Sequence, residues 1–430
     1  MLQTTVLKEK LNSGDYDRLL ADLYCGGALD GIDSVLQRQK SRYIAAVEAF
    51  EKQFGESEVE IYSAPGRSEI CGNHTDHQGG RVLAAAVNLD TIAVVSCFDC
   101  VEVISEGFGK VSFFLDDMDC RKEEWGTTLS LIKGVLAGFH KCGYAVGGFR
   151  AYITGDVMAG AGLSSSAAFE VLIGTILSHL YNGGRIAATE IAQIGQYAEN
   201  VYFGKPCGLM DQMASAVGSM VYMDFYEEDN PKVHRIEPFL EKHDYCLCIT
   251  DTHGSHADLT EEYGAIPREM EAVAEFFGQK KLSRVNEEEF YRNLKHVREV
   301  CKDRAVLRAM HYFEENKRVD TAFKAAKQGD IELFLEQIKK SGSSSCRYLQ
   351  NAYCNKNVQC QDITVALAIS EGILGDKGVA RLHGGGFAGT VQAFVPGGFV
   401  EMYRKAMDDC FGAGSCLVLQ VRKQGGIRVI

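Results

Sequence analysis

FRAYITGDVMAGAGLSSSAAFEVLIGTILSHL, residues 149–180, leads from a strand-like run through a glycine-rich loop into serines and then into an apolar helical pattern. A helix N-terminus offers unpaired N–H groups and a partial positive charge, which suits a phosphate. The serines at 164–166 could cap the helix, bind phosphate oxygens or coordinate Mg²⁺ through a hydroxyl. The loop lacks the lysine of a GxxxxGK[ST] motif. A phosphate loop and a plain serine cap are therefore the two interpretations.

The remaining chain mixes helical and strand patterns without a regular βαβ rhythm, which favours an α+β fold over a doubly wound sheet. Residues 1–55 and 265–350 are predicted to be mainly helical. Pro267 suits a first helical turn, and CLVLQVRK and GIRVI near the end are expected to pair through a glycine turn. Short strands are predicted elsewhere, at 60–65, 91–98, 220–225 and 245–252. We place a domain boundary near 235–245.

Composition and net charge argue against some partners and locations of the protein. The 430-residue chain carries a net charge of −13, which argues against nucleic acid or an anionic membrane as the main partner. No stretch approaches the ~20 apolar residues of a membrane span, and the first residues lack a signal-peptide core. Fifteen scattered cysteines indicate reduced thiols, and the Cys97–Cys100 spacing has no second pair to complete a zinc site. We expect a cytoplasmic protein.

Residues 66–80, GRSEICGNHTDHQGG, form a polar segment expected as a loop between two strands. Asp76 could accept hydrogen bonds from neighbouring hydroxyls of a polyol, and His74 could add another. Arg67 could neutralise a phosphate or depress the pKa of a nearby carboxyl. The spacing of His74, Asp76 and His77 also permits metal binding, but no further ligand cluster accompanies them. Polar contacts to a ligand are the favoured interpretation.

Two further motifs could bring chemistry to the same place. AENVYFGKPCGLMDQMAS, residues 198–215, supplies Glu199 and Asp211, which could serve as a metal ligand and a base. Two solvated acids at loop ends are the alternative. HGGGFAGT, residues 383–390, indicates backbone packed closely against a neighbouring loop or a ligand.

Taken together and in this order, the motifs resemble those of the GHMP small-molecule kinases, and within them the galactokinases. The resemblance covers roughly residues 45–430 and includes the tyrosine of TEEYGAIPREMEAVA. It implies a two-domain α+β fold, with an N-terminal domain like the second domain of ribosomal protein S5 and a ferredoxin-like C-terminal domain. We accordingly expect a helical extension over 1–45, for which we assign no role, and kinase domains over 46–240 and 241–430.

The resemblance also implies an activity, namely ATP-dependent phosphorylation of the anomeric hydroxyl of a hexose, with galactose as the favoured substrate. Asp211 resembles the base, and Arg67 resembles the group that keeps Asp211 ionised. Ser166 and Glu199 resemble the Mg²⁺ ligands. Nucleotide-binding positions are implied at Gly160, Ala161, Gly162, Leu163, Ser164, Ser165 and Ser166, with Trp125 as an adenine-site aromatic. Sugar-binding positions are implied at Arg67, Asn73, His74, Asp76, Gly208, Asp211 and Tyr263. ATP and the sugar are the expected partners of a monomer.

Four positions depart from the galactokinase pattern. Asn73 replaces a glutamate, Glu69 replaces an asparagine, His77 replaces a tyrosine, and Ala388 replaces a glycine. A glutamate at position 73 would repel a substrate carboxylate at C6, and the neutral Asn73 removes that repulsion. Galacturonate is therefore the alternative substrate, and a positive residue beside the C6 end of the pocket would favour it. A reciprocal swap of Glu69 and Asn73 that keeps one acid in the pocket would instead favour galactose.

A different class of function is a sugar sensor that binds sugar and ATP without catalysis. Such galactokinase-like sensors have a disturbed serine-alanine part of the phosphate loop, whereas GLSSSAA, residues 162–168, is intact here. Arg67 and Asp211 are both present as well. The sequence therefore favours an enzyme, while a pentose or amino-sugar kinase would differ only in pocket shape.

Overall fold

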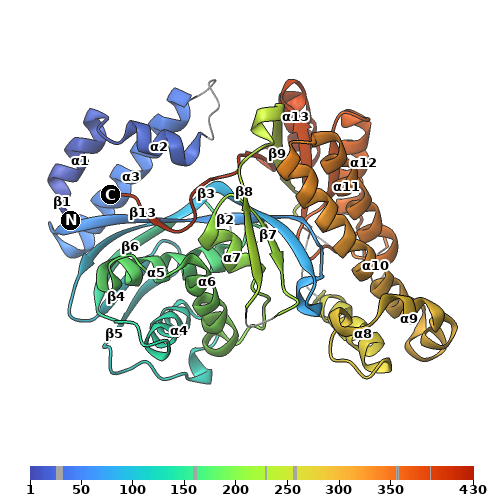
Figure 1. The fold of residues 1–430 in the computed structure, drawn as a ribbon. Coiled ribbons are helices and arrows are strands. Elements are labelled where there is room, and N and C mark those ends of the chain that lie inside the picture. Colours follow the sequence, from blue (N-terminus) through green and yellow to red (C-terminus); the bar gives the residue numbers. More distant parts are fainter. Residues whose placement is uncertain are drawn as a thin grey trace.

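A computed structural model of the chain describes residues 1–25, 32–157, 162–227, 230–254, 259–354, 356, 358–387 and 389–430. The described residues form two β-sheets with their helices (Figure 1). The larger sheet has the order β1-β2-β3-β6-β4-β5, and β13 pairs with β2 while β7 and β8 extend from β3. Its strands are β1 (Leu2–Gln3), β2 (Glu58–Cys71), β3 (Arg81–Cys97), β4 (Val101–Ser105), β5 (Gly109–Phe113), β6 (Phe149–Gly155), β7 (Met220–Asp224), β8 (Lys232–Ile236) and β13 (Ile427–Arg428).

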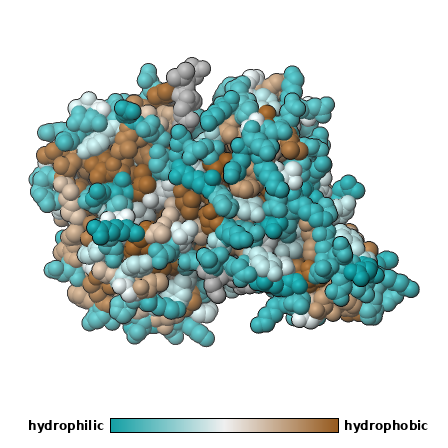
Figure 2. All heavy atoms as spheres, viewed as in Figure 1, coloured by the Kyte–Doolittle hydropathy of each residue, from teal (hydrophilic) through white to brown (hydrophobic). Residues whose placement is uncertain are grey.

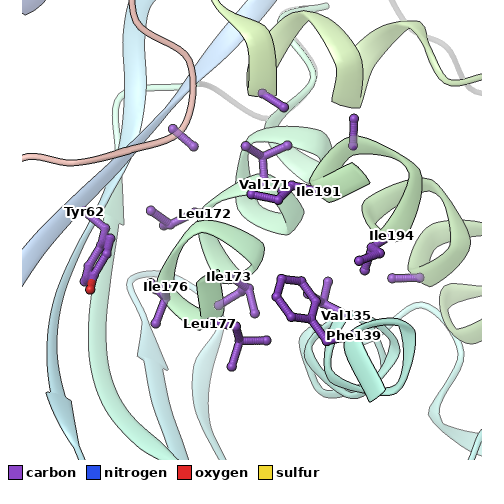
Figure 3. Close-up of a cluster of buried hydrophobic side chains, with 14 of the residues drawn as sticks. Tyr62, Val135, Phe139, Val171, Leu172, Ile173, Ile176, Leu177, Ile191 and Ile194 are labelled. Carbon is purple, nitrogen blue, oxygen red and sulfur yellow. The ribbon is translucent and has the colours of Figure 1, made fainter. Parts of the chain in front are cut away.

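Four helices cover one face of this sheet and build the largest core. Because side chains alternate along a strand, β2 directs Tyr62 and Ala64 to this core and Val59 and Ile61 to the opposite face. Figure 3 shows Phe139 beside Val135, with the aliphatic side chains of the neighbouring helices around them. The helices are α4 (Thr128–Lys141), α5 (Ser165–Asn182), α6 (Ala188–Tyr197) and α7 (Met210–Val217), and a π-helical segment, η3 (Ala198–Phe203), follows α6.

The N-terminal helices cover the opposite face of β2 and β3. They are α1 (Thr4–Ser13), α2 (Asp17–Tyr24) and α3 (Ile32–Phe54). The fully buried Asp90 ties them to the sheet, since it accepts from Arg42 at 2.6 Å, Tyr24 at 2.6 Å and Arg422 at 2.8 Å. Burial alone would raise the pKa of Asp90, but the two guanidinium groups hold it below its ordinary value. Helices α1, α2 and α3 therefore shield a sheet face that would otherwise expose apolar side chains to water.

The smaller sheet has the order β10-β11-β9-β12 with all neighbours antiparallel. In chain order this is 2-3-1-4, with helices between the first and second and between the third and fourth strands, as expected for a ferredoxin-like domain. Its strands are β9 (Tyr245–Asp251), β10 (Val379–Leu382), β11 (Thr390–Pro396) and β12 (Cys416–Leu419). The mixed α+β class predicted from the sequence is confirmed.

Helices pack on both faces of the smaller sheet. Phe394 of β11 packs with Phe334 and Ile338 of α11, whereas Ala393 and Val395 face the opposite side. The helices of this region are α8 (Thr260–Phe276), α9 (Glu287–Arg292), α10 (Leu294–Gln328), α11 (Ile331–Ser344), α12 (Asp362–Leu374) and α13 (Val400–Phe411), with a π-helical turn, η6 (Ser345–Leu349), after α11. Side chains over α10 and α11 are mostly hydrophilic on the face seen in Figure 2. No helix among the described residues is long and apolar enough to cross a membrane.

Three local expectations were wrong. The two terminal strands do not pair with each other, because β12 pairs with β9 and β13 returns to β2. Pro267 lies in the interior of α8 instead of its first turn. The polar segment 66–80 is a loop only from residue 72, because β2 continues to Cys71 past irregularities at Pro65/Arg67 and Glu69/Cys71. The domain limits predicted at 45/46 and 240/241 stay predictions.

Candidate active site

A cavity of about 740 Å³ opens between the end of β2, the loop that follows it, the start of α7, helix α8 and the loop after β10. All seven positions predicted to contact sugar line it, namely Arg67, Asn73, His74, Asp76, Gly208, Asp211 and Tyr263. These residues come from segments far apart in the chain, so the fold brings together what the motifs only implied.

Arg67 and Asp211 form a two-point ion pair at the cavity wall. Arg67 Nε and Nη2 donate to Asp211 Oδ1 and Oδ2, each at 2.6 Å, and the carboxylate also accepts from Ser164 Oγ at 2.7 Å. Burial raises the pKa of Asp211, but Arg67 and Ser164 outweigh burial and leave the pKa below its ordinary value. Asp211 is therefore ionised at neutral pH and held in a fixed orientation.

The start of α5 lies beside this ion pair. Ser164 has left-handed backbone angles (φ 55°, ψ 66°) and forms no capping hydrogen bond, because its hydroxyl reaches Asp211. The serine-cap interpretation is therefore wrong for Ser164. The first N–H groups of an α-helix have no partner within the helix, so those of α5 could bind an anion. Of the predicted nucleotide positions, 162–166 lie in this turn, whereas Gly160 and Ala161 lie outside the described residues.

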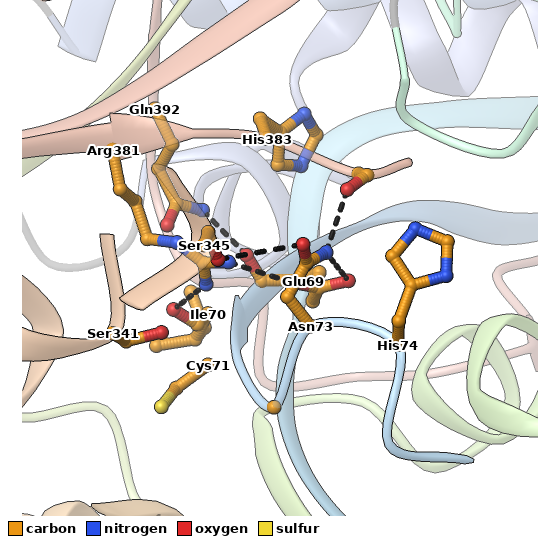
Figure 4. A network of polar contacts seen from close by, with 12 residues as sticks. Glu69, Ile70, Cys71, Asn73, His74, Ser341, Ser345, Arg381, His383 and Gln392 are labelled. Carbon is orange, nitrogen blue, oxygen red and sulfur yellow. Dashed lines mark hydrogen bonds and ion pairs between the residues drawn. The ribbon is translucent and has the colours of Figure 1, made fainter. Parts of the chain in front are cut away.

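The loop after β10 contacts residues 72–80, here called the sugar loop, through backbone carbonyls. Asn73 Nδ2 donates to the carbonyl of Gly384 at 2.7 Å (Figure 4). His74 Nε2 donates to the carbonyl of Gly385 at 3.1 Å. Tyr263 donates its hydroxyl to the carbonyl of Gly386 at 2.7 Å. The expectation that this glycine-rich motif packs against a neighbouring loop is confirmed, although Ala388 lies outside the described residues.

Asp76 and Gly208 are in close contact at the cavity. A Cβ atom added to Gly208 would lie 2.2 Å from Asp76 Oδ2, so only glycine leaves the carboxylate in place. Burial raises the pKa of Asp76 to about 6, and the nearby Glu69 and Asp211 charges add to this. Burial lowers the pKa of His74 to about 4, so its ring is neutral at pH 7. Asp76 thus gives the cavity a carboxylate close to its titration point, and His74 gives it a neutral imidazole.

Glu69 and Asn73 contact each other (Figure 4). Asn73 Nδ2 donates to Glu69 Oε1 at 3.0 Å and Oε2 at 3.1 Å. The fully buried Arg381 forms an ion pair with Glu69 Oε1 at 3.0 Å. Asn73 Oδ1 accepts from Asn351 at 2.8 Å. The sequence did not reveal Arg381, which lies outside every motif, and its charge is matched by the acid at position 69.

Ser166 and Glu199, the two predicted Mg²⁺ ligands, contact each other, with Ser166 Oγ 3.1 Å from Glu199 Oε1. Neighbouring corners of a magnesium octahedron lie about 3 Å apart, since each ligand is about 2.1 Å from the ion. Gln212 Nε2 holds the other Glu199 oxygen at 2.8 Å. No group of three or more His, Cys, Asp or Glu side chains suited to a metal occurs among the described residues. The pair therefore fits an ion that takes its remaining ligands from nucleotide phosphates and water.

Lys205 lies within the segment 198–215 but was not among the predicted site residues. Its Nζ lies 3.1 Å from Glu199 Oε1, and its side chain is 62% exposed. Besides Glu199, its charge also acts on Asp211, whose pKa it helps to lower. A lysine between glycine and proline in a loop has no distinctive local pattern, so only its position in the fold marks it as a candidate for phosphate binding.

Trp125 lies beside the segment that carries Glu199. A Cβ atom added to Gly204 would lie 2.3 Å from the Trp125 ring, and Trp125 is 43% exposed. The indole does not line the sugar cavity. Its role as an adenine-site aromatic stays a prediction.

Comparison with known proteins agrees with this arrangement. Residues 48–97 match the galactokinase galactose-binding signature, and residues 130–219 match the N-terminal domain of GHMP kinases. A galactokinase of Glaesserella parasuis serovar 5 is 31% identical over 376 residues, which span 83% of this chain and 90% of that protein. A galactokinase of Lactococcus lactis subsp. lactis is 28% identical over 390 residues, or 88% of this chain and 94% of that protein.

Solved structures show the same similarity. The crystal structure of Lactococcus lactis galactokinase complexed with galactose matches with a TM-score of 0.75 and 27% identity, covering 90% of this chain and 100% of that chain. The mevalonate kinase of Methanococcus jannaschii matches with a TM-score of 0.59 at 15% identity, covering 85% and 99%. The second match shows a shared fold only.

Proposed function

This chain belongs to the galactokinase family of GHMP kinases, and we propose that it transfers the terminal phosphoryl group of ATP to the anomeric hydroxyl of galactose. The observation that carries the proposal is the Arg67–Asp211 ion pair on the wall of a cavity lined by every predicted sugar-binding residue. The family makes ATP the co-substrate.

The sugar would be held mainly by its ring hydroxyls. Ionised Asp76 accepts from two neighbouring hydroxyls, and neutral His74 has its Nδ1 lone pair available because Nε2 carries the proton donated to Gly385. The pKa of Tyr263 is raised to about 12 by burial, so its hydroxyl stays protonated and supports the loop at Gly386. These contacts would orient the anomeric hydroxyl toward Asp211.

Asp211 would act as the base. The bond between the anomeric oxygen and phosphorus forms while the bond from phosphorus to the ADP oxygen breaks, and Asp211 takes the hydroxyl proton. A carboxylate of low pKa suffices, because phosphoryl transfer needs positioning and charge stabilisation more than a strong base. Arg67 keeps Asp211 ionised and fixes both of its oxygens.

The nucleotide phosphates would lie at the start of α5. Ser166 and Glu199 would hold Mg²⁺, which neutralises phosphate charge when bound. Lys205 would add a cation on the same side, because its exposed ammonium group shares an oxygen of Glu199 with Ser166. Magnesium dependence is tested by adding EDTA and by Glu199→Gln, which should raise the Mg²⁺ concentration required for half-maximal rate.

Galactose is favoured over galacturonate by the charge balance around Glu69. A substrate carboxylate would be attracted by an unmatched cation, but Arg381 already pairs with Glu69 inside the protein. Adding a substrate carboxylate here would bury a second anion against one guanidinium, which is costly in a poorly hydrated pocket. The Glu69/Asn73 exchange therefore keeps one acid in contact with position 73.

A coupled ADP-release assay with galactose and with galacturonate at matched concentrations tests the proposal. We expect turnover with galactose only. Asp211→Asn should lower kcat by about 10²- to 10⁴-fold, the usual contribution of a positioned base, while galactose affinity changes little. Asp409→Asn, an exposed aspartate on α13, is the matched control. Near-normal kcat in the Asp211 variant would show that another group takes the proton.

We also propose a cytoplasmic monomer. The fifteen cysteines are scattered along the chain, a pattern typical of reduced thiols in a reducing compartment. Cell fractionation and sedimentation velocity test the location and the assembly.

A further inference from the structure

A second cavity, of about 490 Å³, lies between α10, α11 and η6, away from the sugar cavity. None of its lining residues belongs to the proposed active site. Four of them are basic and one is acidic, namely Arg318, Lys339, Lys340, Arg347 and Glu336. The feature is notable because the chain as a whole carries a net charge of −13.

Two of these cations lack an acidic partner. Lys340 pairs with Glu336 at 2.7 Å, and Arg318 pairs with the buried Glu315 at 2.6 Å. Neither Lys339 nor Arg347 forms an ion pair with any residue that the structure describes. The cavity therefore has an excess of about two positive charges at neutral pH.

The chemistry of the lining suits a phosphate group. Guanidinium and ammonium groups are the usual phosphate ligands, and the hydroxyls of Ser343 and Ser344 can add neutral hydrogen bonds. The volume lies within the range of small-molecule sites and exceeds what an inorganic phosphate ion fills. A small organic phosphate monoester matches both the charge and the size.

The floor of this cavity is bonded to the sugar loop. Arg318 Nη2 donates to Ser344 Oγ at 2.9 Å, and Ser344 Oγ lies 2.9 Å from His311 Nδ1. His311 Nε2 lies 2.9 Å from the carbonyl of Asn73, which can only accept. His311 therefore carries its proton on Nε2 and accepts from Ser344 through Nδ1. A continuous chain of hydrogen bonds links the cavity to a sugar-contacting residue.

A second connection starts from the same arginine. Arg318 Nε donates to Glu315 Oε2, and Glu315 Oε1 accepts from the backbone N–H of Gly72 at 3.0 Å. Gly72 and Asn73 are the first residues of the sugar loop after β2. Fixing the guanidinium of Arg318 therefore restrains two hydrogen bonds to the start of that loop, one at Gly72 and one at Asn73.

We propose that the cavity between α10, α11 and η6 binds the phosphate group of a small phosphorylated metabolite, and that binding there tightens the hold of the sugar loop on galactose. The ligand reaches Arg318 from the open side of the cavity, while the bonds to Ser344 and Glu315 persist. By linkage, galactose bound at the sugar cavity tightens the phosphate ligand by the same factor.

Calorimetric titration tests binding with glycerol 3-phosphate and, separately, with inorganic phosphate as probes. The protein is first saturated with galactose and a non-hydrolysable ATP analogue, so that the active site is filled. We expect saturable binding of glycerol 3-phosphate that weakens at least about tenfold in Lys339→Gln/Arg347→Gln. Arg404→Gln/Lys405→Gln, which removes the same charge from exposed positions on α13, should bind like the unchanged protein.

Titration with inorganic phosphate shows whether the cavity binds a free phosphate ion or an organic phosphate ester. Weaker binding than that of glycerol 3-phosphate is expected if an organic ester fills the cavity, and equal binding would overturn the assignment to an ester. Absence of binding by both probes, or equal binding in the Lys339/Arg347 variant, would overturn the site itself.

Coupling is measured as the galactose dissociation constant with and without saturating glycerol 3-phosphate, the ATP analogue being present throughout. We expect a decrease of at least about twofold in the unchanged protein and none in Lys339→Gln/Arg347→Gln. An unchanged constant in the presence of bound probe would overturn the link through His311 and Glu315. Because galactose binding is itself the baseline, failure of the proposed sugar-kinase function would appear as no galactose binding in any protein.

Discussion

Asp76 should make galactose binding depend on pH in the mildly acidic range. Burial raises its pKa to about 6 in the sugar-free protein, and the Glu69 and Asp211 charges contribute in the same direction. Only the ionised carboxylate can accept from two sugar hydroxyls at once. Affinity should therefore rise as the pH increases through about 6 and fall as Asp76 becomes protonated below it.

The size of the effect follows from the pKa. With a value of about 6, about nine in ten Asp76 carboxyls are ionised at pH 7 and about one in ten at pH 5. If the protonated form does not bind galactose, the dissociation constant increases about tenfold over that interval. The neighbouring histidines add no charge change here, because burial lowers the pKa of His74 to about 4 and that of His77 to about 3.

Calorimetric titration of galactose without nucleotide, from pH 5 to pH 8, measures this dependence directly. Asp76→Asn should bind more weakly at pH 7 and show no pH dependence between 5 and 7. Glu69 is the other cavity carboxyl that could cause this pH dependence, because burial raises its pKa as well. A flat profile in the unchanged protein, or the same slope in Asp76→Asn, would refute the assignment of the titration to Asp76.

Three other changes give separable outcomes. Lys205→Met should lower kcat/KM for ATP about tenfold with galactose affinity retained, because its ammonium group would contact phosphate and not sugar; steady-state kinetics with each substrate varied will tell. Gly208→Ala places a Cβ 2.2 Å from Asp76 Oδ2, so calorimetry should show a galactose dissociation constant at least about tenfold higher, without loss of fold by circular dichroism. Arg42→Ala leaves the buried Asp90 with one cation fewer and should lower the free energy of unfolding by about 3 kcal/mol in urea titration.

The residues of the candidate site that lie in short sequence motifs could be identified from the sequence. Arg67 and Asp211 are 144 positions apart, yet each lies in a polar, glycine-flanked segment that its neighbours mark as unusual, and the two side chains meet. The extent of β2 could not be predicted in the same way. Polar residues such as Arg67 and Glu69 argue for a loop, but here they lie in a strand, where both line the sugar cavity.

Residues that support the site from a distance left no signal in the sequence. Arg381 lies in a strand and Glu315 in a helix, and neither belongs to a recognisable sequence motif. Each contacts the site through a partner more than 200 positions away in the chain. The N-terminal helices are a similar case. Their amphipathic pattern predicted helices, but only the structure shows that they cover the second face of β2 and β3 and contact Asp90.

The exchange of Glu69 and Asn73 shows why substrate class cannot be read from one motif position. Aligned by position, the loss of a glutamate at 73 argues for a substrate that carries its own carboxylate. In the structure the chain bends at Gly72 (φ 104°), and Asn73 returns to contact Glu69 through both carboxylate oxygens. An acid moved by four positions thus reaches the same neighbourhood, and Arg381 balances it there. If this is the reason why galactose is preferred, Glu69→Gln should free the charge of Arg381 and make galacturonate a competitive inhibitor, whereas Asn73→Gln, which keeps the acid, should not.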